Sequence, residues 1–406
     1  MPLAWTALVG CGALAGVGLV LSLAVPHRTR IPVVTLGAAS MTLSGWGLAL
    51  IVTSAPRASI ALATGALGLA SIAAGYGLGA SVVSSLRPRR AAVALEPRAA
   101  EDPRIGVVVY ADVEPRTYSL SETAEVMALV GEADPPPVPV LVAPFLFAAQ
   151  RSRYQGADGR SPSRDGLRAT AVRLAAELDA DRFAEPAYAA CEGDASLAEA
   201  VADLAARGHR TVVAAPLAVA AGHADHTALR AVDALKPRDA GVRVVHADVL
   251  WHADEIADLV ARRVLLACDG AEDSTGVVLV AHGQPPGWRE AAPEFDAREV
   301  AFLSRVQSLL TEGGMRAGHV RTAWTAWQEP DVPEAVRHLA AVGCARVLAC
   351  PACDPVESLD TLLDLPAAVR MARVPVPTRV LSAWGDAPEV ARALARRIEK
   401  ALAESE

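Results

Sequence analysis

Three long apolar runs occupy most of the first ninety residues. They extend over Leu3–Val25, Val33–Ala55 and Ile60–Leu86, and each reaches the roughly 20 residues that a helix needs to cross a bilayer. Glycine and alanine are frequent in all three, which suits close packing of helices in lipid. The pattern predicts a membrane anchor of three transmembrane helices in residues 1–90. The alternative is a buried helical hairpin in a soluble domain.

Arginines are the only charged residues in this anchor, and they indicate its orientation. Arg28 and Arg30 lie between the first two runs, and three more arginines follow the third run, so all five fall on the same side of the membrane. Positive residues concentrate on the cytoplasmic side of membrane proteins. We therefore expect a multi-pass protein of the cytoplasmic membrane whose remaining chain faces the cytoplasm, although Arg57 on the other side weakens the bias.

A different pattern begins after a linker at residues 91–104. Short apolar runs alternate with stretches of helical period, which is typical of parallel sheets covered by helices. The expected strands are Gly106–Ala111, Val138–Val142, Thr211–Ala215, Val242–His246, Gly276–Ala281, Val347–Cys350 and Thr378–Leu381. The expected helices include Asp165–Leu178, Ser196–Arg207, Ala297–Glu312 and Pro388–Ala403.

An internal repeat divides this α/β region into two similar lobes. Glu199–Pro216 aligns without a gap with Glu334–Pro351, and 10 of the 18 positions are identical. Each copy predicts an amphipathic helix that ends at a glycine, as helices commonly do, followed by a buried strand that ends at a proline. We expect a first α/β lobe at residues 105–265 and a second at 272–406, each with a parallel sheet.

The charge of the α/β region excludes one class of function. All 46 acidic residues lie after residue 95, whereas six of the 38 basic residues lie before it. A body this acidic repels the phosphates of nucleic acids. We therefore expect no binding of DNA or RNA.

The two lobes carry the same strand end with different chemistry. Gly106–Pro115 aligns with Gly276–Pro285, and the residue after the apolar strand is Asp112 in the first copy and His282 in the second. Ligands of such folds bind beyond the carboxyl ends of the strands. An imidazole presented there, in a Gly-Gln-Pro turn, can ligate a metal ion or accept a proton. The candidate chemistry is therefore centred on His282.

The longer repeat adds further candidates. It places His223 opposite Ser358 and Asp225 opposite Asp360, with Glu357 next to Ser358. Imidazoles and carboxylates that converge in a cleft can bind a divalent cation or take up protons. A histidine in a Gly-His loop is equally typical of a protein surface, and an acidic residue at a helix start is common capping chemistry.

Three of the six cysteines cluster in the second lobe, at Cys344, Cys350 and Cys353. Their spacing matches none of the ferredoxin patterns, which argues against an iron–sulfur cluster. Cys350 lies in an apolar strand-like run, where a small buried thiol is common. We therefore expect no iron–sulfur cluster at these cysteines.

Four motifs resemble the ferrochelatases, which insert ferrous iron into a porphyrin. Ala281–Pro285 (AHGQP) is similar to the Ala-His-Ser-Leu-Pro of that family, and Glu357–Leu365 to its Asp-His-Ile-Glu-Thr-Leu-Tyr-Glu-Leu. Trp327–Pro330 resembles its Trp-Leu-Gly-Pro, and Arg153–Pro162 a segment that lines the porphyrin cleft. The four occur in the order of the family and span most of residues 105–400.

The resemblance implies roles for particular residues. His282 and Asp360 correspond to the catalytic and metal-handling histidine and acid of the family, with Glu357 as a further metal ligand. Substrate binding falls to Arg153, Tyr154, Ser161 and Trp327. The implied partners are a porphyrin and a divalent metal, and no cofactor is implied beyond the Fe²⁺ substrate. His223, Asp225 and Asp112 are secondary candidates.

Some positions depart from the family pattern and leave alternatives open. Ser358 stands where the family has a second histidine, and Asp360 is one methylene shorter than the expected glutamate. The loop Pro216–His226 looks closer to the sirohydrochlorin and cobalt chelatases of the same fold. The alternatives are therefore insertion of cobalt or iron into sirohydrochlorin, and a non-catalytic membrane protein that binds haem or another tetrapyrrole.

Overall fold

The computed structural model describes residues 2–54, 58–86, 93–95, 102–131, 139–191, 193 and 195–405. The chain forms two compact units. Unit 1 consists of Met1–Arg89 and Thr117–Arg160, and unit 2 consists of Arg90–Arg116 and Ser161–Glu406. Part of the predicted linker, including residues 96–101, lies outside the described residues.

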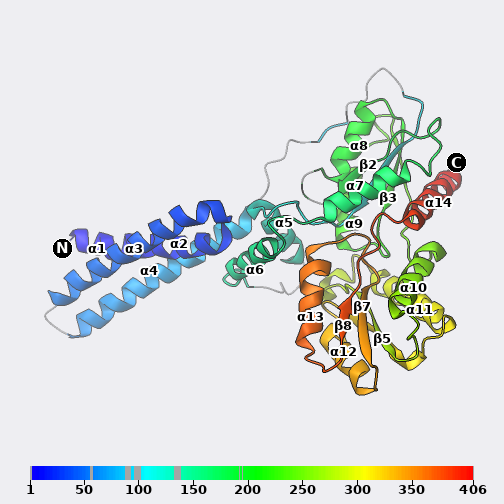
Figure 1. Cartoon of the computed structure of the whole chain (residues 1–406). Helices are drawn as coiled ribbons and strands as arrows, with labels where there is room; N and C mark the ends of the chain where they lie inside the picture. Colours follow the sequence, from blue (N-terminus) through cyan, green and yellow to red (C-terminus); the bar gives the residue numbers. More distant parts are fainter. Residues whose placement is uncertain are drawn as a thin grey trace. The chain divides into compact units, whose positions relative to one another are not determined.

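Unit 1 contains three helices that are long and apolar enough to cross a membrane (Figure 1). The first candidate span, Pro2–Ala24, is made of α1 (Pro2–Thr6), a π-helical turn (Ala7–Cys11) and α2 (Gly12–Ala24). The others lie in α3 (His27–Thr53) and α4 (Ala58–Ser85). The three helices predicted from the apolar runs are thereby confirmed.

Glycines allow α2 and α4 to approach each other closely. A Cβ added at Gly75 would lie 2.0 Å from the carbonyl oxygen of Ala13, and one at Gly16 would lie 2.1 Å from that of Ile72. Any larger residue at these positions would push the two backbones apart. Close packing of this kind stabilises helix pairs in lipid, where no hydrophobic effect drives them together.

Two further helices, α5 (Leu120–Gly131) and α6 (Ala143–Gly156), complete unit 1. Both pack against α4, and α6 also packs against α2. The strand predicted at Val138–Val142 is wrong: Pro139–Val142 forms a turn that leads into α6, while Val138 lies outside the described residues. A short apolar run does not by itself distinguish a strand from the start of a helix. Residues 117–160, assigned from sequence to the first lobe, thus belong to unit 1.

Unit 2 contains two four-stranded parallel sheets, which confirms the predicted fold class. The first has the order β2-β1-β3-β4 and the second has the order β6-β5-β7-β8. Their strands are β1 (Gly106–Ala111), β2 (Ala187–Ala190), β3 (Thr211–Pro216) and β4 (Arg243–His246), then β5 (Thr275–Ala281), β6 (Val320–Trp324), β7 (Arg346–Pro351) and β8 (Thr378–Val380). The equivalent orders agree with the internal repeat, in which β1 corresponds to β5 and β3 to β7.

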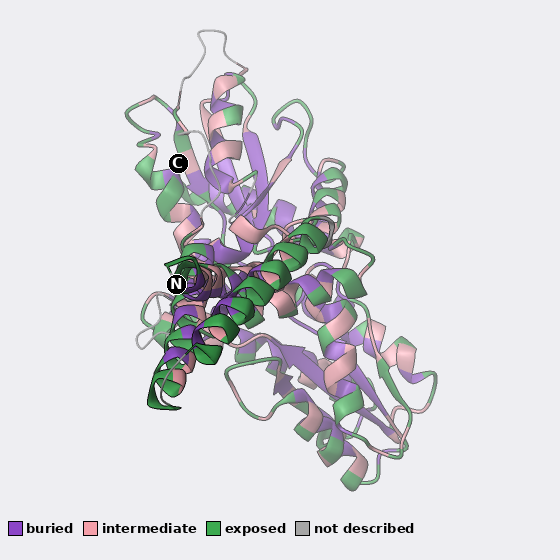
Figure 2. Cartoon of the chain, turned by 90° about the vertical axis from the view of Figure 1, so that its left-hand side faces the viewer, coloured by how far each residue is buried: buried purple, intermediate pink, exposed green. Residues whose placement is uncertain are grey.

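Helices cover both faces of each sheet, as parallel sheets require. They are α7 (Ser163–Leu174), α8 (Leu197–Ala206), α9 (His223–Ala234), α10 (Asp254–Cys268), α11 (Phe295–Glu312), α12 (Val332–Ala341), α13 (Leu365–Met371) and α14 (Pro388–Ser405). Short turns occur at Pro286–Trp288, Ala317–His319 and Asp360–Asp364, the last being π-helical. The central strands β1 and β5 are buried along their whole length (Figure 2).

Two helices cross between the lobes and hold them together. The last helix, α14, follows the second sheet in sequence but packs against α7 and β3 of the first lobe. Conversely, α10 follows the first sheet in sequence but packs against α11 of the second lobe. One hydrophobic core therefore includes side chains from both sheets, such as Val109 of β1 and Leu279 of β5. This shared core positions the ends of β1 and β5 relative to each other.

Candidate functional site

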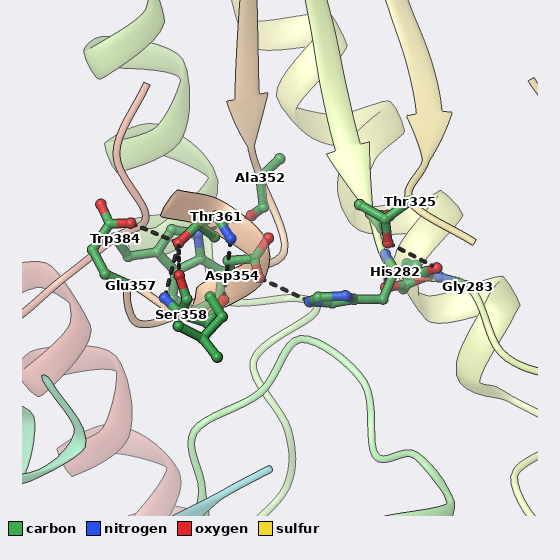
Figure 3. A network of polar contacts seen from close by, with 12 residues as sticks. His282, Gly283, Thr325, Ala352, Asp354, Glu357, Ser358, Thr361 and Trp384 are labelled. Carbon is green, nitrogen blue, oxygen red and sulfur yellow. Dashed lines mark hydrogen bonds and ion pairs between the residues drawn. The ribbon is translucent and has the colours of Figure 1, made fainter. Parts of the chain in front are cut away.

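His282 follows the last residue of β5 and forms an ion pair with Asp354, which follows the end of the neighbouring strand β7 (Figure 3). The imidazole Nε2 lies 2.8 Å from Oδ1 of Asp354. The side chain of His282 is 40% exposed, whereas that of Asp354 is only 8% exposed. The buried carboxylate thus holds one nitrogen of the imidazole, and the rest of the ring remains accessible to a ligand.

The surroundings of His282 favour its protonated form. The negative charge of Asp354 is the main cause, and it raises the pKa of His282 to about 10 despite the opposing effect of burial. The hydrogen bond to Asp354 and the charges of Asp360 and Glu299 act in the same direction. The imidazolium form of His282 is therefore favoured at neutral pH in the metal-free protein.

A second acid, Glu299, fixes the backbone of the histidine loop. Its buried carboxylate accepts hydrogen bonds from the N–H groups of His282 and Gly283, each at 3.2 Å. Burial raises the pKa of Glu299, and the neighbouring imidazole and these two N–H groups lower it. Gly283 has a φ of 71°, and a Cβ there would lie 2.5 Å from the carbonyl oxygen of Ala326. A residue with a side chain would therefore be strained at this position.

Two predicted acids lie within electrostatic reach of His282. Asp112, which follows β1, has an exposed surface, yet the protein atoms around its carboxyl group raise its pKa. The charge of His282 lowers that pKa and the charge of Asp360 raises it. The charges of these three side chains therefore influence one another. The site thus includes the strand ends of both lobes.

The segment around Asp360 is held by its own hydrogen bonds. Glu357 accepts one from the hydroxyl of Thr361 at 2.7 Å and another from the N–H of Ala383 at 3.0 Å. The hydroxyl of Ser358 accepts one from the N–H of Thr361 (Figure 3). Both carboxylate oxygens of Glu357 are thus engaged within the second lobe, and the hydroxyl of Ser358 is hydrogen-bonded to the π-helical turn that Asp360 begins.

Glu114 connects this segment to the first lobe. Its carboxylate accepts a hydrogen bond from the backbone N–H of Leu359, at 3.0 Å, and one from the hydroxyl of Ser161, at 2.5 Å. Ser161 is buried. The predicted substrate residue Ser161 therefore supports Glu114, and through it the position of the turn that carries Asp360.

His223 and Asp225 are buried at the start of α9. The His223 ring stacks on Trp288 of the second lobe, with 5.0 Å between ring centroids. The carboxylate of Asp225 accepts a hydrogen bond from the N–H of Gly222 at 2.8 Å. Burial raises the pKa of Asp225 to about 7, and the charge of Asp112 acts in the same direction. Both side chains therefore take part in packing and capping.

The remaining predicted substrate residues are distributed over both units. Arg153 and Tyr154 lie on α6 of unit 1, where the buried Tyr154 ring packs edge-on against Tyr118. Trp327 lies in unit 2, in the loop after β6 that contacts Gly283, and its side chain is about half exposed. Its φ of 66° is unusual for a bulky residue. Such conformations are found at functional sites more often than elsewhere.

Among the residues that the structure describes, no three or more His, Cys, Asp or Glu side chains are arranged to hold a metal ion. The predicted set of His282, Asp360 and Glu357 is therefore not a preformed cage. Cys350 and Cys353 are buried, and burial raises the pKa of both thiols. Neutral thiols are poor metal ligands.

Sequence reasoning missed Asp354 and Glu299, although each has a recognisable signal. Asp354 is the first acid after β7, the hydrogen-bonded neighbour of β5. Glu299 lies on the buried stripe of α11, between Phe295 and Phe302. A charged residue on an apolar stripe requires a buried partner.

The duplicated parallel sheets, with a histidine and carboxylates at their strand ends, are those of a chelatase, an enzyme that inserts a metal ion into a tetrapyrrole. The family model named Ferrochelatase matches residues 109–402 of this chain. Because the match covers well over half of the sequence, the chain belongs to the ferrochelatase family. The resemblance seen in the four motifs is thereby confirmed.

Several solved structures are similar to this chain. SirB from Bacillus subtilis with Fe³⁺ has 13% identity and a TM-score of 0.45, over 74% of this chain and 96% of that one. CbiX, described as the terminal enzyme for biosynthesis of siroheme in denitrifying bacteria, has 17% identity and a TM-score of 0.40, over 73% and 99%. No curated protein matches the chain at a significant level.

Proposed function

We propose that this protein is a membrane-anchored chelatase that faces the cytoplasm and inserts Fe²⁺ into a porphyrin, either coproporphyrin or protoporphyrin, in haem biosynthesis. The observation that carries the proposal is the ion pair of His282 and Asp354 at the ends of adjacent strands, within reach of the charges of Asp112 and Asp360. Family membership supplies the reaction class.

The charges of the site suit this reaction. Metal insertion brings in a divalent cation and releases two protons from the pyrrole N–H groups. Asp112, Asp354 and Asp360 attract the cation and can accept protons, since the raised pKa of Asp112 makes it a better base than an ordinary carboxylate. Asp360 and Asp354 thus act on the side of His282, and Asp112 acts from the other lobe.

His282 serves in this proposal as the residue that holds Fe²⁺ and hands it to the macrocycle. An imidazolium does not ligate a metal, so Fe²⁺ binds only as the proton of His282 leaves. Asp354 is placed to hold the ring in position during this exchange. Metal binding should therefore strengthen as the pH rises towards the pKa of about 10.

Trp327 is the predicted substrate residue of unit 2 that we assign to the macrocycle. It offers a half-exposed aromatic face next to the histidine loop. The three apolar helices of unit 1 support an anchor in the cytoplasmic membrane, close to poorly soluble porphyrins.

The proposal is tested by anaerobic metal insertion into coproporphyrin, protoporphyrin and sirohydrochlorin, with the full-length protein in lipid nanodiscs. We expect Fe²⁺ insertion into one of the two porphyrins, and its loss in His282→Ala. His246→Ala is the matched control, because His246 is an exposed histidine at the end of β4.

Other outcomes identify the alternatives. Turnover of sirohydrochlorin alone, abolished by His223→Ala, would assign the chemistry to the first lobe. No turnover of any of the three, with tight haem binding retained, would instead indicate a non-catalytic haem-binding protein.

A further inference from the structure

The segment that follows the histidine loop of the second lobe contacts the first lobe. It consists of residues 284–295 and leads from β5 into α11, and we call it the covering segment. The side-chain amide of the buried Gln284 donates a hydrogen bond to the carbonyl oxygen of Ala292 at 3.0 Å. The N–H of Ala292 in turn donates to the carbonyl oxygen of Trp288 at 2.9 Å. These bonds fix the course of the segment, and thereby the position of Trp288.

Two aromatic side chains of the covering segment lie against the start of α9. The indole of Trp288 stacks on the imidazole of His223, with 5.0 Å between ring centroids and an angle of 18° between ring planes. Phe295 contacts the preceding residue, since its Cε2 atom is 3.4 Å from the position that a Cβ of Gly222 would occupy. His223 is only 6% exposed, and its Nδ1 is buried. A metal ion binds an imidazole through a ring nitrogen, so this burial limits His223 as a ligand.

The two lobes carry the same pair of side-chain types in exchanged positions. In the second lobe, His282 follows the central strand β5 and Asp354 follows its neighbour β7. In the first lobe, Asp112 follows the central strand β1, and His223 begins the helix after its neighbour β3. The side chain of His282 is 40% exposed, whereas His223 is buried. The two histidines therefore differ in their access to a ligand.

Carboxylates lie near His223, as a cation site requires. Asp225 is buried two residues further along α9, where its carboxylate accepts hydrogen bonds from the N–H of Gly222 at 2.8 Å and from the thiol of Cys191 at 3.6 Å. Asp112 lies within electrostatic reach of Asp225. Imidazole and carboxylate groups are common ligands of divalent cations. The side-chain types of a metal site are thus present in the first lobe, although no three of them are arranged as ligands within the described residues.

We propose that Trp288 determines which lobe handles the metal: its indole closes His223 to metal ions and so confines metal binding to His282. The inference rests on the proposed function, which assigns the chemistry to His282. Trp288 lies six residues after His282 in the chain, so the segment that presents one histidine also carries the cover of the other. Removing the indole should expose His223 and leave the ion pair of His282 and Asp354 in place, because that pair does not involve Trp288.

Histidine modification by diethyl pyrocarbonate tests the cover, with the full-length protein in lipid nanodiscs and the modified residues mapped by mass spectrometry. In the wild type, we expect His223 to react several-fold more slowly than His246, which is exposed. Trp288→Ala should raise the rate at His223 several-fold, whereas Trp288→Phe keeps an aromatic ring and should retain the protection. Trp251→Ala is the matched control: it removes an indole that packs edge-on against His252, at 4.7 Å between ring centroids, and should leave His223 protected.

Binding of Co²⁺ in the absence of a tetrapyrrole tests the effect on metal specificity. Isothermal titration calorimetry should detect an additional bound Co²⁺ in Trp288→Ala compared with the wild type. The additional site should be lost when His223→Ala is combined with Trp288→Ala. Trp288→Phe and Trp251→Ala should bind Co²⁺ as the wild type does.

The outcomes distinguish this inference from the proposed function. If His223 reacts as fast as His246 in the wild type, the cover is overturned without any variant. Exposure of His223 in Trp288→Ala with unchanged Co²⁺ binding would overturn the role of Trp288 in metal specificity. Neither result affects the dependence of Fe²⁺ insertion on His282. Conversely, absence of Fe²⁺ insertion, with both expected results for His223, would overturn the proposed activity and leave the cover intact. Trp288→Leu is the second variant should Trp288→Ala fail to fold.

Discussion

The ends of β1 and β5 occupy equivalent places in equivalent sheets, yet their residues differ in what supports them. His282 is paired with Asp354, and its backbone is held by Glu299. Asp112 is an exposed carboxylate. The buried acid of the first lobe, Asp225, instead caps its own helix. Duplication thus reproduces the backbone of the two strand ends, while the acids that support their side chains differ between the copies.

The largest expected difference between the lobes is in activity. His282→Ala should lower the rate of Fe²⁺ insertion by about 10²–10⁴-fold, the usual contribution of a positioned acid or base. Asp112→Ala should lower it by only about tenfold, because other carboxylates still attract the cation. Single-turnover measurements of metalloporphyrin formation compare the two. An equal or larger loss in Asp112→Ala would reverse the assignment of the lobes.

A second experiment removes the partner of the second-lobe histidine. Asp354→Asn keeps the size of the side chain and removes the charge that is the main cause of the raised pKa. The pKa of His282 should therefore fall from about 10 towards the ordinary value of about 6.5. NMR titration of the imidazole in the metal-free protein measures this change.

The same substitution has a consequence for stability with a defined sign. In the wild type, the contribution of the pair is complete below about pH 6.5 and is lost as the pH rises through the folded value of about 10. Asp354→Asn should lose this dependence. An unchanged pKa of His282 in the variant would show that Asp354 is not the main cause.

The buried acid of the first lobe predicts a pH effect in a lower window. The folded pKa of Asp225 is raised from 3.8 to about 7, so its neutral form is favoured in the folded protein. The contribution of Asp225 to the free energy of unfolding should be complete below about pH 4 and should fall by ~2–4 kcal/mol as the pH rises from there through about 7. Asp225→Asn should abolish this fall, whereas Asp233→Asn, an exposed position on the same helix, should retain it. Denaturant unfolding of the full chain in detergent provides the measurement.

The smallest expected effect concerns the bridge between the lobes. Glu114→Gln keeps one carbonyl acceptor for Leu359 and Ser161 but removes the charge that strengthens both bonds. We expect a loss of about 1 kcal/mol in the free energy of unfolding. Glu185→Gln, an exposed position in the same unit, serves as the control. Equal stability of the two variants would show that Glu114 does not help to position Asp360.

Much of the fold could be predicted from the sequence, and the failures have physical causes. β1 and β5 were predicted within a residue, because six consecutive apolar residues bounded by turns are characteristic of a strand buried on both faces. β2 and β6 were missed, since AYAA and VRTAW lack such a run. The apolar residues of the turn at Pro139–Val142 predict a strand, because they follow no helical period until α6 begins.

The site was predicted in part. His282 could be identified by the contrast with Asp112, and Asp360 by the repeat and the family motif. Its direct partner, Asp354, lies 72 residues from His282 in the chain, and only the pairing of β5 with β7 brings the two together. Glu357 and Ser161 lie in segments that match the family motifs, but hydrogen bonds within unit 2 engage both side chains.

The sequence by itself determined the class of the protein: three apolar helices, two repeated α/β lobes and one strand-end histidine follow from local patterns of residues. The tertiary structure alone decided how that histidine is charged, because its protonation depends on Asp354, Glu299 and Asp360, which come from three separate elements. It also decided that residues 117–160 belong with the apolar helices. Hydrophobic periodicity is a property of residues that are close in the sequence. The topology of the fold, by contrast, determines which distant residues become electrostatic and packing partners.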